Sequence, residues 1–246
     1  MEVSEYHKMA AVEDEMWYYH ALHRQIEFML RKYVPLNSGR ILDAGCGTGG
    51  LMKRLQPRFP EWSWQGVDSS AVACELARER AGVDVFEATL TDLPVPAEHY
   101  SAVVSADVIY HIEDDQQALN EMARVLEPGG IMIINVPAYR WLWSYHDEAV
   151  HSKRRYGRRE LRVKLNQAGL NCLTLTHSNM FLLPLIVLRR KLFPAPEGGS
   201  DVQEYPAWLN AILKGVMAVE RWLLSICGAL PFGSSILAVA QKTSRI

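Results

Sequence analysis

Short apolar stretches alternate with amphipathic ones between residues 39 and 177 of the chain. The stretches at 39–46 and 131–137 are almost continuously hydrophobic, which is typical of strands buried on both faces of a parallel sheet. Between such stretches, apolar residues such as Leu119 and Met122 recur at helical spacing. Strands that alternate with helices predict an α/β fold whose parallel sheet is covered by helices on both faces.

The pattern changes on either side of this region. Residues 11–34 are rich in aromatic side chains and histidine, and they predict one long helix. After residue 137 an aromatic loop leads into a basic helix that ends at Gly169, and the chain closes with a strand at 234–242. Before that strand, apolar residues at steps of three and four predict one buried helical face, formed by Leu209, Ile212, Val216, Val219, Leu223 and Ile226.

These segments predict a single domain with a helical insertion. The best linker candidate is PAPEGGSDVQE at 194–204, which is rich in turn-forming residues. The expected parts of the domain are an N-terminal helical lid (1–38), a core (39–177), a helical cap (178–232) and a final strand (233–246).

Composition excludes several classes of protein. The net charge of −2 does not favour a nucleic-acid partner. The four cysteines are far apart and form no CxxC pair, so we expect free thiols in a reducing cytoplasm and no metal site. The N-terminus lacks the apolar stretch of a signal peptide, and the longest apolar run, at 180–188, is too short to span a bilayer. We therefore expect a cytoplasmic protein without a transmembrane segment.

The stretch ILDAGCGTGG, at 41–50, places four glycines after a buried strand. Gly45, Gly47 and Gly50 satisfy the GxGxxG pattern that lets a backbone approach a dinucleotide closely. Asp68 follows Gly49 by 19 residues, at the end of the next predicted strand, where an acid can bind both hydroxyls of a ribose. The spacing therefore predicts an adenosine-containing cofactor.

Asp43 distinguishes between cofactors. A carboxylate two residues before the first glycine would repel a pyrophosphate but would attract a cationic ligand. With Gly45, Gly47 and Gly49 it forms an acid-x-Gly-x-Gly-x-Gly motif, and here the chain resembles the class I S-adenosylmethionine-dependent methyltransferases. The resemblance implies a Rossmann-like, seven-stranded, mostly parallel sheet with an antiparallel last strand. It also implies S-adenosylmethionine as cofactor and S-adenosylhomocysteine as product.

The resemblance extends to LEPGG at 126–130 and to YSAVVSADVIYHI at 100–112. The segments at 13–19 and 139–161 are similar to those of a bacterial subgroup that acts on small molecules, sugars or lipids. Thr89 stands where many relatives place an acid against the adenine, so the backbone and Leu90 are expected to contact it instead. The cofactor contacts that the resemblance implies are Asp43, Gly45, Cys46, Gly47, Gly49, Asp68, Ser69, Thr89, Leu90, Ala106 and Trp17.

Methyl transfer from a sulfonium is an in-line displacement, so alignment and exclusion of water supply most of the acceleration, and a general base adds to it when the acceptor is a hydroxyl. His111 lies at the end of a predicted strand, where ligands of open sheets bind. The other candidate bases follow the fifth strand: His146, His151 and Tyr156. A purely structural role is the alternative for each.

Five cations lie in HSKRRYGRRE at 151–160, and they are either a solvated helix start or a site for an anionic group of the acceptor, bound by Arg154 and Arg155. The other expected acceptor contacts are Tyr110, Trp143, Tyr145 and Trp222. The apolar cap is expected to cover the sheet, or else to form an acceptor pocket, a homodimer face or a peripheral membrane contact.

These observations predict a methyltransferase that acts on a small molecule, most readily at oxygen, with an acceptor that has an apolar part. An NAD-dependent oxidoreductase and a non-catalytic cofactor-binding scaffold are the alternatives.

Overall fold

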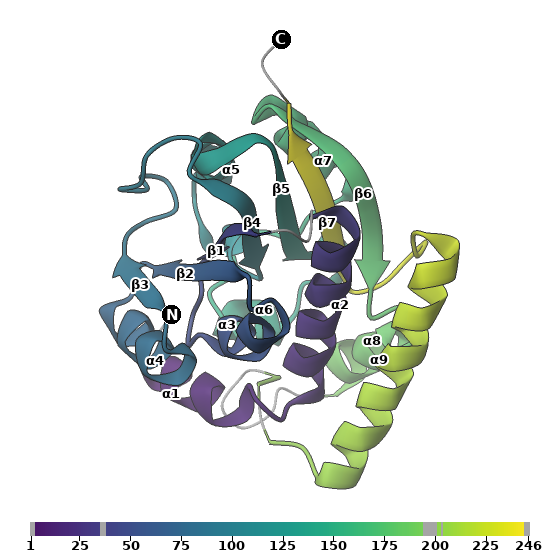
Figure 1. Cartoon of the computed structure of the whole chain (residues 1–246). Coiled ribbons are helices and arrows are strands. Elements are labelled where there is room, and N and C mark those ends of the chain that lie inside the picture. The colour runs from purple at the N-terminus through teal and green to yellow at the C-terminus, as the bar shows by residue number, and fades with distance from the viewer. Residues whose placement is uncertain (1–2, 35–37, 194–200, 203, 244–246) are drawn as a thin grey trace.

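The structure is a computed structural model, and it describes residues 3–34, 38–193, 201–202 and 204–243. A seven-stranded sheet forms its centre, in the order β3-β2-β1-β4-β5-β7-β6 (Figure 1). The strands are β1 (Gly39–Ala44), β2 (Trp62–Asp68), β3 (Asp84–Glu87), β4 (Tyr100–Ala106), β5 (Leu126–Pro137), β6 (Leu170–Ser178) and β7 (Ser235–Lys242).

Strands β1 to β5 are parallel, whereas β7 runs antiparallel to both β5 and β6. The predicted seven-stranded sheet with an antiparallel last strand is therefore confirmed. The strand order changes direction between β1 and β4, and the carboxyl ends of the strands at such a point form the usual ligand site of an open α/β sheet.

Helices cover both faces of the sheet (Figure 1). They are α1 (Val3–Val12), α2 (Trp17–Tyr33), α3 (Gly50–Leu55), α4 (Ala71–Ala81), α5 (Asp115–Val125), α6 (Tyr145–Ala149), α7 (Arg158–Gln167), α8 (Leu183–Leu192) and α9 (Ala207–Cys227), with short 3₁₀ turns η1 (Gln56–Arg58), η2 (Ile109–His111) and η3 (Arg140–Leu142).

Side chains of each strand alternate between two hydrophobic cores. In β4, Val103 packs into the core formed with α5 and α7, whereas Ala102 and Val104 pack into the core formed with α2, α3 and α4. Burial on both faces explains why these strands are almost continuously apolar in the sequence.

The N-terminal segment forms two helices instead of the single helix expected at 11–34, and that prediction was wrong. The chain leaves helical geometry between α1 and α2 because its acidic residues bind elsewhere. Glu13 accepts hydrogen bonds from Thr48 and Arg80, at 2.6 Å each, and Asp14 pairs with Arg80 and Lys53. The break therefore ties the N-terminus to the glycine loop and to α4.

Helices α8 and α9 lie between β6 and β7, at the place of the predicted cap. The buried face of α9 differs from the predicted stripe, since it consists of Leu213, Met217, Glu220 and Leu224. Of the predicted residues, Leu209, Val216 and Leu223 are half-buried, and Ile212, Val219 and Ile226 are exposed. Both sides of this helix are apolar, so periodicity alone could not identify the inner one. Most of the predicted linker, at 194–200 and 203, lies outside the described residues.

Candidate functional site

Three carboxylates lie at the carboxyl ends of adjacent strands of the sheet. Asp43 is the penultimate residue of β1, Asp68 is the last residue of β2, and Asp107 directly follows β4. Asp43 is level with Gly66 of β2 and Val104 of β4. The three residues therefore lie at the same edge of the sheet, where the strand order changes direction.

The glycine loop turns sharply between β1 and α3. Gly45, Gly47 and Gly49 have φ of 84°, 51° and 80°, a region that residues with a Cβ seldom adopt. A Cβ on Gly45 would lie 2.4 Å from Val108, and one on Gly49 would lie 2.9 Å from the backbone of Ala77. The loop thus depends on glycine both for its conformation and for its close packing.

Asp68 holds this loop in place. Its carboxylate accepts hydrogen bonds from the backbone N–H groups of Gly47 and Ser70, each at 3.0 Å. Burial raises the pKa of Asp68, and the backbone hydrogen bonds partly offset that rise. An acid at the end of the second strand, fixed beside a glycine loop, is placed to accept hydrogen bonds from ribose hydroxyls.

Asp43 lies beneath the loop and is 2% exposed. Its Oδ2 has no hydrogen-bond partner among the described residues. Burial raises its pKa well above the usual range, and the negative charges of Glu13 and Asp68 raise it further. A buried acid that lacks a partner and has negative neighbours fits a cationic ligand such as S-adenosylmethionine, which has a sulfonium and an ammonium group.

Helix α1 lies over the glycine loop. The Tyr6 hydroxyl donates to Asp68 at 3.5 Å, and a Cβ on Gly47 would lie 2.9 Å from the Met9 methyl group. Burial, with the charge of Asp68 adding to it, raises the pKa of Tyr6 to about 12, so this phenol stays a donor. The N-terminal segment therefore covers the site that the sequence assigns to the cofactor.

Asp107 is the residue of this site that sequence reasoning missed. It has a φ of 60°, accepts from the Tyr18 hydroxyl at 2.5 Å and accepts from Asn135 Nδ2 at 2.8 Å. Burial raises its pKa to about 6, against the lowering effect of these two hydrogen bonds. The sequence did contain a signal for Asp107, because it directly follows a predicted buried strand, and the predicted site residues Asp43 and Asp68 also lie at strand ends.

A gap too small for a water molecule lies beside Tyr18 and Asn135, the two residues that donate hydrogen bonds to Asp107. Its lining residues are Tyr18, Leu22, Gln25, Asn135, Ser178, Asn179 and Met217. The Oδ1 atom of Asn135 is buried without a hydrogen-bond partner among the described residues, while its Nδ2 atom is fixed by Asp107. Because an unpartnered buried acceptor is costly, this atom is a candidate for contact with a ligand.

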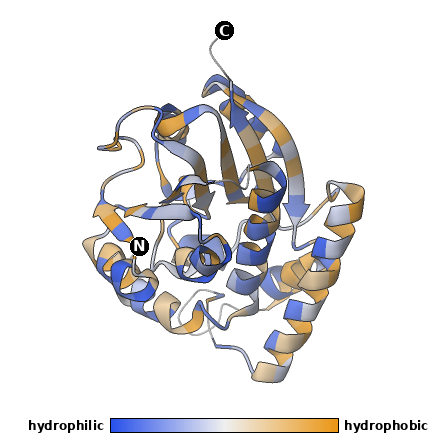
Figure 2. Cartoon of the chain, viewed as in Figure 1, coloured by the Kyte–Doolittle hydropathy of each residue, from blue (hydrophilic) through white to orange (hydrophobic). Residues whose placement is uncertain are grey.

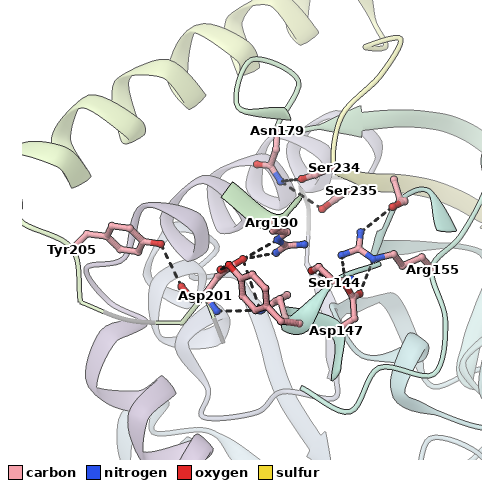
Figure 3. Close-up of polar contacts among 12 residues, drawn as sticks. Ser144, Asp147, Arg155, Asn179, Arg190, Asp201, Tyr205, Ser234 and Ser235 are labelled. Atoms are coloured by element: carbon pink, nitrogen blue, oxygen red, sulfur yellow. Dashed lines mark hydrogen bonds and ion pairs between the residues drawn. The ribbon is translucent and has the colours of Figure 1, made fainter. Parts of the chain in front are cut away.

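The predicted anion-binding residues form ion pairs inside the protein (Figure 3). Arg155 is 2% exposed and binds both oxygens of Asp147, at 2.6 and 2.9 Å, as well as the backbone oxygen of Ala138. Arg154 pairs with Asp115 at 2.9 Å and donates to backbone oxygens of the loop after η2. Their guanidinium groups already have protein partners, so these arginines stabilise the loop after β5.

Tyr156, a candidate base, is fully buried and donates to Asp115 at 2.7 Å. Burial, and the hydrogen bond to Asp115 after it, raises the Tyr156 pKa. His146 accepts from the backbone N–H of Asp201 at 3.1 Å, and burial lowers its pKa to about 4. Both side chains lie among the ion pairs that follow β5 rather than beside Asp107.

His111 and His151 lie together, since His111 Nδ1 is 3.5 Å from the His151 backbone oxygen. Burial lowers the pKa of His111 to about 4, so its ring is neutral at pH 7. Its ring packs on Tyr110, with centroids 4.0 Å apart. Tyr110 and His111 belong to η2, which begins two residues after Asp107. Of the three histidines predicted as bases, His111 is therefore the one nearest to Asp107 in the sequence.

The remaining predicted contacts are divided between the site and other regions. Cys46, Ser69 and Ala106 lie at strand ends around the glycine loop, whereas Leu90 packs in the core and Thr89 bonds Thr91. Trp17 packs towards α9, and its backbone N–H donates to Asn210. The rest lie on later segments: Trp143 accepts from Lys191, Tyr145 donates to Asp201, and Trp222 is exposed on α9.

Within the described part of the chain, no group of three His, Cys, Asp or Glu side chains could hold a metal ion.

Comparisons with known proteins agree with this geometry. Residues 41–130 match the family model of a methyltransferase domain. An uncharacterized methyltransferase of Mycobacterium bovis is 33% identical over 109 residues, which is 43% of this chain and 54% of that protein. The ubiquinone/menaquinone biosynthesis C-methyltransferase of Geotalea daltonii is 32% identical over 111 residues, 42% of this chain and 46% of that protein. The chain thus spans about half the length of these relatives.

A solved S-adenosylmethionine-dependent methyltransferase of Thermotoga maritima, described as a possible histamine N-methyltransferase, shares the fold. Its TM-score is 0.62 at 19% identity, over 98% of this chain and 96% of that one. The glycine loop, the sheet order and these likenesses agree: residues 41–130 carry a methyltransferase domain, and the fold is the Rossmann-like fold of the S-adenosylmethionine-dependent methyltransferases.

Proposed function

We propose that this chain transfers a methyl group from S-adenosylmethionine to a small-molecule acceptor that binds beside Asp107. The observation that supports this most strongly is the set of three carboxylates at the strand ends: Asp43 and Asp68 are buried, and Asp107 is half-buried. None of them forms an ion pair with a described Lys, Arg or His. A cationic cofactor would supply the positive charge that these acids lack.

The roles of the residues follow from their positions. S-adenosylmethionine supplies an activated methyl group when it is bound, so the protein has to align the acceptor and exclude water. Asp68 would accept hydrogen bonds from the ribose hydroxyls, and Asp43 would support the cationic aminoacyl end. The glycine loop would close around that end.

Asp107 would accept the proton that the acceptor loses. A pKa of about 6 keeps it largely ionised at pH 7 and still makes it a stronger base than an ordinary carboxylate. Tyr18 and Asn135 hold both of its oxygens, so its orientation is set before the acceptor binds.

The unpartnered Oδ1 atom of Asn135 supports an acceptor with a hydrogen-bonding group such as a hydroxyl, and the neighbouring Leu22 and Met217 support an apolar part. The side chains packed there would have to separate to admit it. Methylation at oxygen is the first candidate, because a carboxylate base suits a hydroxyl acceptor. Methylation at carbon is the second candidate, because the relative from Geotalea daltonii is a C-methyltransferase. A phenolic acceptor serves either outcome, since loss of its proton activates both the oxygen and the ring carbons.

The test combines cofactor binding with turnover. We expect calorimetry to show binding of S-adenosylmethionine and S-adenosylhomocysteine but not of NAD. Incubation with methyl-labelled cofactor and a pool of phenolic and quinol-like acceptors should produce labelled products, which fragmentation by mass spectrometry identifies as O- or C-methylated. Binding of the cofactor without any product would favour the scaffold alternative, and binding of NAD would favour the oxidoreductase.

Asp107→Asn tests the proposed base. It should lower kcat by roughly 10²–10⁴-fold and leave the affinity for S-adenosylhomocysteine unchanged. Asp84→Asn, at an exposed position of β3, is the matched control. Equal turnover in both variants would contradict the role of Asp107 but not the assignment of the cofactor.

A further inference from the structure

Exposed apolar side chains gather on the segment between β6 and β7. Fourteen large hydrophobic side chains are exposed among the described residues, and eleven of them lie between positions 181 and 232. They are Phe181, Leu185, Leu188, Leu192, Phe193, Trp208, Ile212, Val219, Trp222, Ile226 and Phe232. Exposed apolar side chains that are concentrated in this way mark an interaction surface.

Helix α9 carries the longest part of this surface, along the outside of the molecule (Figures 1 and 2). Trp208 and Trp222 are 66% and 63% exposed, and Ile212, Val219 and Ile226 are exposed beside them. The side chains from Trp208 to Ile226 span about 27 Å at 1.5 Å per residue. The other exposed positions of this stretch are small and uncharged: Ala211, Gly215, Ala218 and Ser225.

The opposite side of α9 is already used inside the protein. Leu213 and Met217 pack with Ala21 of α2 and Leu182, and Leu224 enters the main core. The fold of a single chain therefore accounts for the inner side of the helix and leaves the outer apolar face without a partner among the described residues.

The charges of α8 and α9 have one sign at the surface. The two helices carry Arg189, Arg190, Lys191, Lys214 and Arg221. Their one acid, Glu220, is fully buried and accepts hydrogen bonds from the backbone of Asn179 and Phe181. Acids from other segments approach two of the cations, Asp201 at Arg190 and Glu15 at Lys214. The whole chain, in contrast, has a net charge of −2.

We propose that the outer face of α8 and α9 binds the surface of an anionic lipid bilayer. The outer face of the two helices is apolar, with tryptophan and leucine, and the helices carry five cations and no exposed acid of their own. This is the composition of a helix that lies in the plane of a membrane interface. No described helix is long and apolar enough to cross a bilayer, so the contact is with the surface. A second copy of the chain fits less well, because an isologous contact would bring these cations together.

The proposal has a consequence for the acceptor, and that consequence rests on the proposed function. Met217, on the inner side of α9, lies beside Tyr18 and Asn135, the two residues that donate hydrogen bonds to Asp107. A chain bound through the outer side of the same helix would hold this region close to the bilayer. An acceptor dissolved in the lipid would then have a short path to the site.

The test uses the full chain and measures its co-sedimentation with vesicles, which does not depend on activity. We expect binding to vesicles of equal parts phosphatidylcholine and phosphatidylglycerol, weak binding to phosphatidylcholine alone, and a loss of binding as salt increases. The double variant Val219→Ser/Trp222→Ser should weaken binding by tenfold or more, on the order expected for two large apolar side chains. Val163→Ser, at an exposed valine of α7 outside this face, should bind as the wild type does.

A second pair of variants tests how much the cations contribute to vesicle binding. Lys214→Gln/Arg221→Gln should weaken binding to the anionic vesicles, whereas Lys32→Gln/Arg159→Gln, with the same change in net charge, should not. Analytical ultracentrifugation without lipid completes the experiment. No binding to anionic vesicles, equal binding by Val219→Ser/Trp222→Ser and the wild type, or a wild-type dimer that this double variant breaks would overturn the proposal. Vesicle binding by a chain that shows no methyl transfer would leave it standing while the proposed function fails.

Discussion

Two groups of buried and half-buried carboxylates in this protein have opposite surroundings. At the strand ends, Asp43, Asp68 and Asp107 are held by backbone amides and neutral side chains, or lack a partner. After β5, in contrast, Asp147 binds Arg155, and Asp201 binds Arg190 (Figure 3). The negative charges of Asp147 and Asp201 are therefore balanced by arginines of the protein, whereas those of the three strand-end acids are not.

The pKa shifts follow the same division. Burial raises the pKa of all three strand-end acids. Burial also opposes ionisation of Asp201, but Arg190 and His146 lower its pKa below the usual value. The comparison separates acids that a cation neutralises within the fold from the three strand-end acids, which are candidates for contact with a cationic ligand.

The largest effect that this comparison predicts is the loss of cofactor binding in Gly47→Val. A β-branched residue at a φ of 51° is strained, and its side chain would meet Met9 inside the loop. We expect no S-adenosylhomocysteine binding by calorimetry and a native far-UV circular dichroism spectrum. Gly129→Val, at a φ of 80° but in open space, is the control, and retained binding in Gly47→Val would contradict the assigned site.

Arg155→Ala should produce the next largest effect, on stability. Its removal leaves the buried Asp147 without a cation, which costs about 3–5 kcal/mol of unfolding free energy. Urea denaturation measures this loss. Arg140→Ala breaks an exposed pair with Glu160 and should cost less than about 1 kcal/mol. If Arg155→Ala instead left stability intact and raised KM for charged acceptors alone, Arg155 would belong to the acceptor site.

Asp68→Ala should weaken S-adenosylhomocysteine binding by about 2–4 kcal/mol, because two ribose hydroxyls and the loop amide of Gly47 would lose a charged acceptor. Calorimetry at constant pH gives the difference. Asp84→Ala removes an exposed acid of β3 and should not change the affinity. Equal affinities for both variants would place the cofactor elsewhere.

The smallest predicted effect is the pH dependence of stability that Asp107 causes. Its pKa of about 6 is above the unfolded value near 3.9, so the folded state binds more protons between these values. The contribution of Asp107 to stability is therefore complete below about pH 4 and is lost as pH rises through 6.

From pH 7 to pH 5, the wild type should gain on the order of 1 kcal/mol relative to Asp107→Asn. Urea denaturation of both proteins at the two pH values gives the difference between their unfolding free energies. The other titrating groups contribute equally to both proteins and do not affect this difference. A constant difference would show that the pKa of Asp107 is unshifted.

The sheet and the glycine loop were predictable because local rules determine them. Buried strands must be apolar, and a turn with three positive φ values requires glycine. The residue types at 41–50 were therefore enough to predict a buried strand followed by a tight turn. The antiparallel last strand came from the family resemblance instead.

The acceptor side was less predictable, because its character depends on long-range pairing. Nothing near Arg155 in the sequence indicates that Asp147 neutralises it, and nothing near Asp107 indicates that Tyr18 and Asn135 converge on it. The register of α9 was missed for a related reason, since a helix that is apolar on both sides does not show which side the fold will cover.

The hydroxyl of Tyr6 couples helix α1 to the proposed cofactor site. It donates to the carboxylate that we assign to the ribose, so a ribose bound there would displace it if α1 has to open for the cofactor to enter. The apparent dissociation constant is then the intrinsic one divided by the fraction of molecules in which α1 is open. A closed population of about 90% would weaken apparent binding about tenfold. The opening rate of α1 would also set an upper limit on the association rate of the cofactor.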